Sequence, residues 1–388
     1  MRNIIGPPVE GDDFFGREDE LPYVWQKIED GNSIILPAPR RVGKSSFAKK
    51  LLAIAKQKGW DTLEINLEEI HTEPAFIALF IDKLKGLSWW EKVKDKAGGL
   101  LEQFKSVKPT IKYEDVEIQL EWQRQREDVY KAIAELLDHQ KPTLIFFDEL
   151  AVLLTSIAKA ENGKVEVANF LHWLRSLRQV SGTKIRWVFC SSVGIENFAY
   201  AHQLSDTLND VPPYHLKAFD AKTSFALIKA LEKSSGIELN DAVRQAMLDK
   251  VRYYLPYFLQ ILFEKISSII KIEKAEVNEQ IVDTAYQALL DESYLNTWVE
   301  RLKEQYGELE KDAFALLKHI CQAENGTKRD NLLNLLLSRH NNDPDIGEDR
   351  LSTLLYMLRN DGYLMDEAGL YLFRSPLIRD FWYNRFVR

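Results

Sequence analysis

The sequence predicts an α/β protein in which a parallel β-sheet with helices on both faces is followed by a helical part and a helix-and-hairpin part. Apolar strand-like runs alternate with helical stretches up to about residue 216, and strand signals vanish from about residue 217. Unbroken apolar strands that alternate with helices are typical of a parallel sheet buried on both sides. We therefore expect a sheet-containing core over 1–216, a helical domain over 217–300 and a third domain over 301–388.

The elements of the first part follow from the spacing of apolar residues. Short apolar runs bounded by turn residues predict strands over 33–37, 61–67, 143–147 and 184–191. Helical spacing predicts helices over 45–58, 75–87, 124–139 and 165–180. Residues 88–126 fit neither pattern cleanly, so we predict an insertion there, with a hairpin or edge strand over 110–122.

The rest of the chain is predicted to form a run of helices and then a mixture of helices and a hairpin. Residues 220–323 are predicted to form a run of helices, broken near Gly236 and Pro256. Helical stretches over 308–323, 328–339 and 347–361 then precede a hairpin with arms at 363–365 and 370–373. Three helices followed by a two-stranded wing is the pattern of a winged-helix domain.

Composition excludes several classes of protein. The chain has 388 residues and a formal net charge of −8, so no global attraction to nucleic acid or to an anionic membrane is expected. Cys190 and Cys321 lack metal-type spacing, which argues against a disulfide framework or zinc site. We find no signal-peptide pattern and no run near the 18 or so apolar residues of a membrane span. We therefore expect a cytoplasmic protein without a membrane partner.

A phosphate-binding loop is predicted where the first strand meets the first amphipathic helix. Its signature runs through Ala38, Pro39, Arg40, Arg41, Val42, Gly43, Lys44 and Ser45, with Ser46 next in the helix. Backbone N–H groups at such a loop and helix N-terminus bind phosphate. Lys44 is expected to reach the β- and γ-phosphates, and Ser45 to ligate Mg²⁺. Ala38 replaces the usual first glycine, which is tolerable if position 38 needs no positive φ.

These features predict binding of a purine nucleoside triphosphate, ATP, with Mg²⁺, and of its product ADP. The alternative is a basic surface turn that matches the signature by chance, and the flanking strand and helix argue against it.

Asp148 and Glu149 end an entirely apolar strand. Ligands of open parallel sheets bind at this edge. We expect Asp148 to hold the metal and Glu149 to polarise the attacking water. The alternative is an acidic pair favoured by the dipole at a helix N-terminus.

Two further catalytic positions are predicted with open alternatives. The next strand ends in Ser191 and Ser192, and a hydroxyl there, for which we name Ser192, is a candidate sensor of the γ-phosphate; turn capping is the alternative. Arg175 and Arg178 lie on the preceding helix. Arg178 is a candidate to act on a neighbouring subunit's nucleotide, and a surface salt bridge is the alternative.

With these residues in place, the sequence resembles STAND-type ATPases of the AAA+ group, in their archaeal-type branch. The segment 14–21, Phe-Phe-Gly-Arg-Glu-Asp-Glu-Leu, is similar to that family's Gly-Arg-Glu box. The loop at 39–46, the strand with its acidic pair at 144–149 and the C-terminal segment 373–382 resemble it too. Segment 254–259 resembles the Gly-x-Pro lid motif, with Tyr254 where glycine is usual.

The resemblance implies a P-loop ATPase core, a helical lid and a C-terminal winged helix. It also implies that Gly16 and Arg17 lie along the adenine and ribose, that Pro256 closes over the base, and that the protein acts as a switch. From the residues alone, the Gly16 segment is equally a helix-starting turn and Pro256 a helix break.

The charge of the predicted winged helix does not support DNA as a partner. Residues 328–388 hold nine Lys/Arg and nine Asp/Glu, and the expected recognition helix over 347–361 has a net charge of −1. A DNA-reading helix is expected to carry basic or amide side chains.

Three functions follow. The first is a slowly hydrolysing ATP switch with a protein partner or self-association. The second is a DNA-binding ATPase of a mobile element or defence system, and the third is a non-catalytic nucleotide-binding scaffold.

Overall fold

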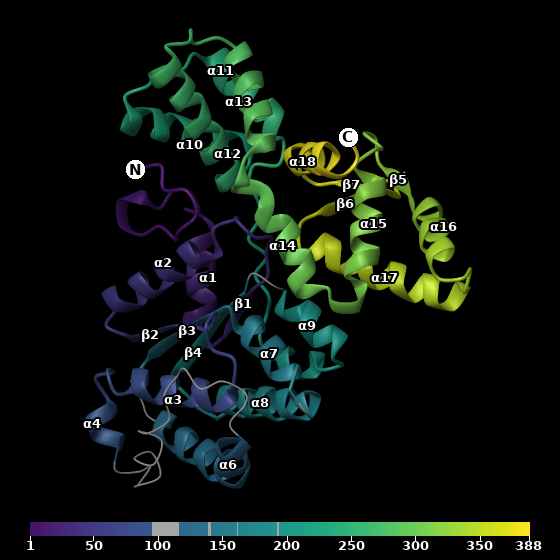
Figure 1. The fold of residues 1–388 in the computed structure, drawn as a ribbon. Coiled ribbons are helices and arrows are strands. Elements are labelled where there is room, and N and C mark those ends of the chain that lie inside the picture. The colour runs from purple at the N-terminus through teal and green to yellow at the C-terminus, as the bar shows by residue number, and fades with distance from the viewer. Residues whose placement is uncertain (95–115, 139–140, 161, 192–193) are drawn as a thin grey trace. The chain divides into compact units, whose positions relative to one another are not determined.

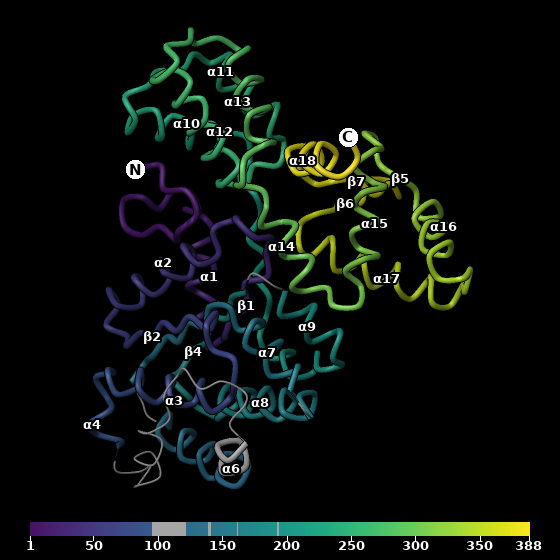
Figure 2. Tube along the Cα trace, viewed as in Figure 1, coloured from purple at the N-terminus to yellow at the C-terminus, as the bar shows by residue number. Residues whose placement is uncertain are grey.

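The structure, a computed structural model, describes residues 1–94, 116–138, 141–160, 162–191 and 194–388. They form two compact units, which Figure 2 traces along the chain. The sheet unit consists of Arg17–Pro37 and Lys44–Leu216. The helical unit consists of Met1–Gly16, Ala38–Gly43 and Lys217–Arg388.

A parallel sheet forms the centre of the sheet unit, as predicted. Its strands are β1 (Ile34–Leu36), β2 (Asp61–Asn66), β3 (Thr143–Asp148) and β4 (Ile185–Cys190), in the order β1-β4-β3-β2. Beyond β1, the backbone N–H of Ile35 donates to Pro212 (3.3 Å) and that of Tyr214 donates to Ile35 (2.8 Å). The segment around Pro213 therefore continues the sheet past β1.

Helices cover both faces of this sheet (Figure 1). The sheet unit contains α1 (Glu20–Glu29), α2 (Lys44–Gln57), α3 (Glu73–Leu84), α4 (Trp90–Val93), α6 (Val116–Leu137), α7 (Leu150–Ala158), α8 (Gly163–Arg178), α9 (Ile195–Ala201) and a 3-10 turn, η4 (Ser205–Leu208). Alternate residues of β3 and β4, such as Phe147 and Trp187, enter one apolar core with α3, α6 and α8. Every residue of β1 and all of β3 except Asp148 are buried, as expected for strands covered on both faces, whereas β2 at the edge alternates buried and exposed residues over Leu63–Asn66.

The predicted strand over 110–122 is wrong for its described part, because Val116–Leu137 is the helix α6. Val116 and Leu120 are four residues apart, so this short run satisfies helical spacing as well as alternation. Residues 110–115 lie outside the described residues.

Both described ends of the predicted insertion contribute to the core. Trp89 is buried and its indole N–H donates to Thr143 Oγ1 (3.2 Å). Trp122 is buried and donates to the Glu73 carboxyl (3.2 Å), which also accepts from the Tyr130 hydroxyl. Burial raises the pKa of Glu73 to about 8, so this carboxyl is held in its neutral form near pH 7.

The helical unit begins with the predicted run of helices. They are α10 (Ala221–Ser235), α11 (Asp241–Val251), α12 (Pro256–Ser268) with a π-helical extension η5 (Ile269–Glu273), α13 (Gln280–Asp291) and α14 (Asn296–Gln305). Local chemistry sets their ends. The Asp220 side chain caps α10 by accepting from the Thr223 N–H, and Gly236 ends that helix with φ +69°.

The three helical stretches and the hairpin predicted for the C-terminal part appear in that order, and a final helix over Pro376–Phe386, which was not predicted, follows them. The elements of this part are α15 (Glu310–Ile320), β5 (Thr327–Lys328), α16 (Arg329–Arg339), α17 (Pro344–Asn360), β6 (Leu364–Glu367), β7 (Leu370–Phe373) and α18 (Pro376–Phe386). The strand β5, which sequence spacing did not indicate, pairs with β7 in an antiparallel sheet. The Tyr286 hydroxyl on α13 donates to Asp380 on α18 (2.7 Å), which joins the two helical parts of this unit.

Candidate nucleotide-binding site

The phosphate loop lies between β1 and α2, as its signature predicts. Gly43 has φ +97°, a conformation that favours glycine. Ala38 is not among the residues with positive φ, so alanine is accommodated at the position where the signature has its first glycine. Lys44 is the first residue of α2 and is only 7% exposed. Of the other predicted loop residues, Pro39 and Val42 are buried, and Arg40, Arg41, Ser45 and Ser46 are partly exposed.

The two predicted metal ligands are in contact. The Ser45 hydroxyl donates to Asp148 Oδ2 (2.7 Å) from the first turn of α2 to the end of β3. Burial, with a smaller effect from Glu149, raises the pKa of Asp148, and the hydrogen bond from Ser45 and the charge of Lys44 oppose this. A hydroxyl and a carboxylate are the oxygen ligands that Mg²⁺ prefers. This pair therefore fits the metal that the loop implies.

Glu149 meets a hydroxyl from the neighbouring strand. The Ser191 hydroxyl, just after β4, donates to Glu149 Oε2 (3.1 Å). Because β3 and β4 are parallel neighbours, their carboxyl ends bring these side chains to one edge of the sheet. The structure thus places Ser191 at the acidic pair, while Ser192 lies outside the described residues.

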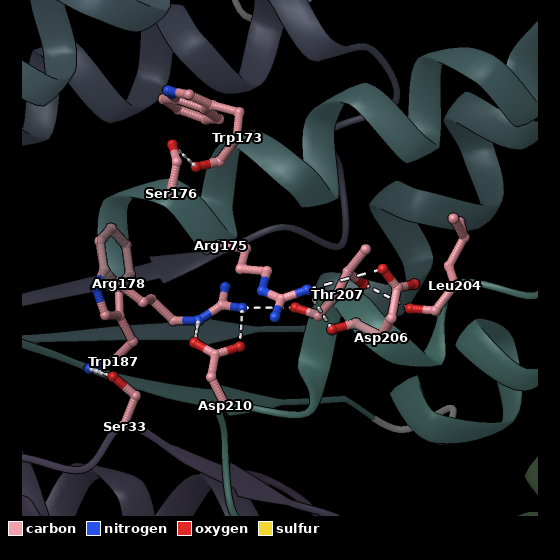
Figure 3. Close-up of polar contacts among 10 residues, drawn as sticks. All are labelled: Ser33, Trp173, Arg175, Ser176, Arg178, Trp187, Leu204, Asp206, Thr207 and Asp210. Carbon is pink, nitrogen blue, oxygen red and sulfur yellow. Dashed lines mark hydrogen bonds and ion pairs between the residues drawn. The ribbon is translucent and has the colours of Figure 1, made fainter. Parts of the chain in front are cut away.

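Arg178 is engaged within its own subunit, and its predicted action on a neighbouring nucleotide has no support in this geometry. Its guanidinium binds both carboxylate oxygens of Asp210 (2.9 Å each) and donates to the Thr207 carbonyl (2.6 Å), as Figure 3 shows. The side chain of Arg178 is only 3% exposed. Reaching another subunit would break these bonds. Asp210 lies 32 residues along the chain, and no sequence signal marks it as the partner.

Arg175 is held more loosely in the same region. Its guanidinium donates to the Asp206 carbonyl (2.8 Å) and lies 3.7 Å from that residue's carboxylate (Figure 3). The side chains of Arg175 and Asp206 are 27% and 57% exposed. The surface salt-bridge alternative therefore describes Arg175.

The Gly-Arg-Glu box adopts unusual backbone angles. Gly16 has φ +72°, and a Cβ there would lie 3.1 Å from the Phe219 ring, so both conformation and space favour glycine. The Phe219 N–H donates to the Tyr254 carbonyl (3.0 Å), two residues before Pro256 starts α12. The helical unit thus brings Gly16 and the predicted lid motif to the same phenylalanine.

Arg17 has φ +74° in the sheet unit, is 5% exposed and forms an ion pair with Glu20 (2.6 Å).

Sequence reasoning missed the partner of Arg41. Its guanidinium lies over the Tyr257 ring, 4.4 Å from the centroid, and donates to the Gly6 carbonyl (3.3 Å). Burial lowers the pKa of Arg41. Tyr257 directly follows Pro256 in the predicted lid motif. An aromatic side chain at this position was the one sequence feature that could have indicated a partner for an arginine of the loop.

Comparisons with solved structures bear on the fold. A Walker-type ATPase of Pyrococcus abyssi superposes with a TM-score of 0.62 at 16% identity, covering 98% of this chain and 99% of the other. The ORC2 protein of Aeropyrum pernix, in ADPNP–ADP complexes, has a TM-score of 0.51 at 14% identity, covering 96% of both chains. No protein-family model and no curated protein matches the sequence. The chain has the fold of a P-loop ATPase.

Within the part of the chain that the structure describes, no helix is long and apolar enough to cross a membrane.

Proposed function

We propose that this protein is an ATP-binding, slowly hydrolysing molecular switch of the STAND type within the AAA+ group. The contact between the Ser45 hydroxyl and the Asp148 carboxylate (2.7 Å) carries this proposal. It joins the helix after the phosphate loop to the acidic end of a buried strand. A basic surface turn that matched the signature by chance would not need this contact.

Each residue has a distinct role in the proposed mechanism. Lys44 and the loop amides hold the phosphates of ATP. Ser45 and Asp148 hold the metal, and bound Mg²⁺ neutralises charge on the phosphates. Glu149 orients the attacking water, and the hydrogen bond from Ser191 orients Glu149.

Each of the three proposed domains has its own role in the switch. The core over 1–216 binds nucleotide, the lid over 217–300 includes Pro256, and we interpret 301–388 as a winged helix. Gly16 and Arg17 are proposed to lie along the adenine and ribose. The bound nucleotide, ATP or ADP, would then set the orientation of the lid and the winged helix. These two domains would in turn act on a protein partner or on a second copy of the chain.

Charges on α17 support a protein partner over DNA. Arg350 binds the buried Asp312 (3.1 Å), and Arg329 binds Glu348 (2.6 Å). Asp345 and Asp349 are exposed. Two of the nearby cations are thus paired within the protein, and acids face solvent. Duplex-DNA gel shifts at several salt concentrations test this. Binding that weakens steeply with salt would contradict the protein-partner proposal and favour the DNA-binding ATPase.

Calorimetry and phosphate release test the proposed function. Lys44→Ala should abolish ATP binding, whereas Lys56→Ala, an exposed site at the other end of α2, should bind like the parent. Glu149→Gln should bind ATP and lose turnover, by about 10²- to 10⁴-fold if it acts as the general base. Unchanged binding in Lys44→Ala refutes the phosphate site. Intact binding without hydrolysis in the parent would favour the scaffold alternative.

A further inference from the structure

A glycine after α17 lies against the phosphate loop. Within the helical unit, a Cβ on Gly362 would lie 2.6 Å from Pro39 Cβ and 2.8 Å from Pro39 Cγ. Real Cβ atoms essentially never approach other atoms this closely. Gly362 also has φ +84°, so glycine meets both a conformational and a spatial need.

Buried polar groups fix the residues on either side of this glycine. Asp361 and Arg301 are 3% and 1% exposed and form an ion pair at 2.9 Å. The Tyr306 hydroxyl donates to the other Asp361 oxygen (2.8 Å). On the far side, the Tyr363 hydroxyl donates to the Trp298 carbonyl (2.6 Å). Because breaking a buried pair is costly, residues 361–363 are firmly held against α14 and the turn after it.

The same loop has a second contact within the helical unit. Arg41 lies over Tyr257 at the start of α12 and donates to Gly6. Pro39 and Arg41 are therefore held by two different parts of this unit, the segment after α17 and the lid helix α12. The loop over 38–43 is thus in contact with residues that are far from it in the sequence.

We propose that the segment Asp361–Tyr363 positions the phosphate loop through Pro39 and so sets the affinity of the protein for ATP. The inference rests on the proposed function, because the loop is taken to bind ATP. Coupling of binding free energies is reciprocal. If packing of this segment against Pro39 favours ATP binding, bound ATP therefore favours that packing by the same factor.

Gly362→Ala is the test variant and Gly369→Ala its matched control. Gly369 has φ +81°, close to that of Gly362, but a Cβ there meets nothing within 4 Å. Both substitutions place alanine at a positive φ and so introduce similar backbone strain. Only Gly362→Ala also introduces a methyl group that clashes with Pro39. We expect Gly362→Ala to weaken ATP binding, measured by calorimetry on the full chain, about tenfold or more relative to Gly369→Ala. Equal affinities would overturn the proposal.

A double-mutant cycle separates action through Pro39 from a general defect. Pro39→Gly removes the Cβ and Cγ that the new methyl group meets, so Gly362→Ala should cost much less affinity in that background. The same loss in both backgrounds would refute the role of Pro39. If Gly362→Ala does not fold, Tyr306→Phe removes only the hydroxyl that holds Asp361, and a several-fold loss of affinity is expected; parent-like affinity would then overturn the proposal.

Amide hydrogen exchange without nucleotide gives an independent readout. Residues 38–43 should exchange faster in Gly362→Ala than in Gly369→Ala, whether or not the chain binds ATP. A parent that does not bind ATP would refute the proposed function alone, whereas parent-like exchange of the loop in Gly362→Ala would refute the positioning role.

Discussion

Replacing Arg178 with methionine tests whether this residue is structural or acts on a neighbouring subunit. The substitution keeps an unbranched side chain about as long as the aliphatic part of arginine and removes the guanidinium whose contacts Figure 3 shows. The Arg178 side chain is 3% exposed. It leaves the Asp210 carboxylate without its cation and the Thr207 carbonyl without its 2.6 Å donor.

The expected loss of stability follows from that burial. Removing one partner of a buried ion pair costs about 3–5 kcal/mol. Asp210 keeps 20% of its side-chain exposure, so solvent offsets part of the loss and we expect about 3 kcal/mol. For a unit of roughly 200 residues, this lowers the melting temperature by about 6–12 °C.

Calorimetry on the full chain measures this change, because a chain of two units need not unfold in one transition. Arg175→Met is the control: its pair with Asp206 is more exposed than that of Arg178, so a loss below about 1 kcal/mol is expected. Asp210→Asn in the Arg178→Met background should recover part of the loss. A variant that melts like the parent but loses ATPase activity only where subunits associate would refute this reasoning and restore the role in trans.

Two further perturbations test the core and the acidic pair. Burial raises the pKa of Glu73 from 4.5 to about 8, so between these values the folded protein holds a proton that the unfolded chain has released, and stability falls as the pH rises through this window. Glu73→Gln should remove that slope from urea unfolding curves measured at pH 5–8, and an unchanged slope would show that another group titrates. Ser191→Ala removes the hydroxyl that donates to Glu149, so turnover should fall about tenfold at unchanged ATP affinity; parent-like phosphate release would leave the turn-capping role.

Features set by residues near in sequence were predicted well. The apolar run over 143–147 and its acidic end identified β3 and Asp148, because a buried strand needs apolar side chains on both faces. The strand over 110–122 was wrong, since a short alternation that also has four-residue spacing does not distinguish strand from helix.

Contacts between distant residues carried no local signal. Asp210 gives no sign in the sequence that it will bind Arg178, and any of several acids had the right charge. Gly362 reads as an ordinary turn glycine, and only the fold shows that Pro39 occupies the space beside it.

Backbone conformation supplies an argument for the candidate site that is independent of the motif. A non-glycine residue with positive φ is uncommon and costs of order 1 kcal/mol unless its side chain suits that conformation, as asparagine does. Among the described residues, Arg17, Arg41 and Glu149 have φ of +74°, +70° and +60°. Arginine and glutamate lack the short amide that eases this conformation.

Seven other described non-glycine residues also have positive φ, among them Lys274, a helix C-cap in the left-handed conformation that is ordinary there, Arg252, the C-cap of α11, and Ala368, in the turn between β6 and β7. Arg17, Arg41 and Glu149 instead fall in the Gly-Arg-Glu box, the phosphate loop and the acidic pair. Strain of this kind persists where the surroundings hold it, and it concentrates at functional sites. Positive φ therefore occurs in each of the three segments that the sequence motifs identify, and the strain it carries there is consistent with a functional role for these segments.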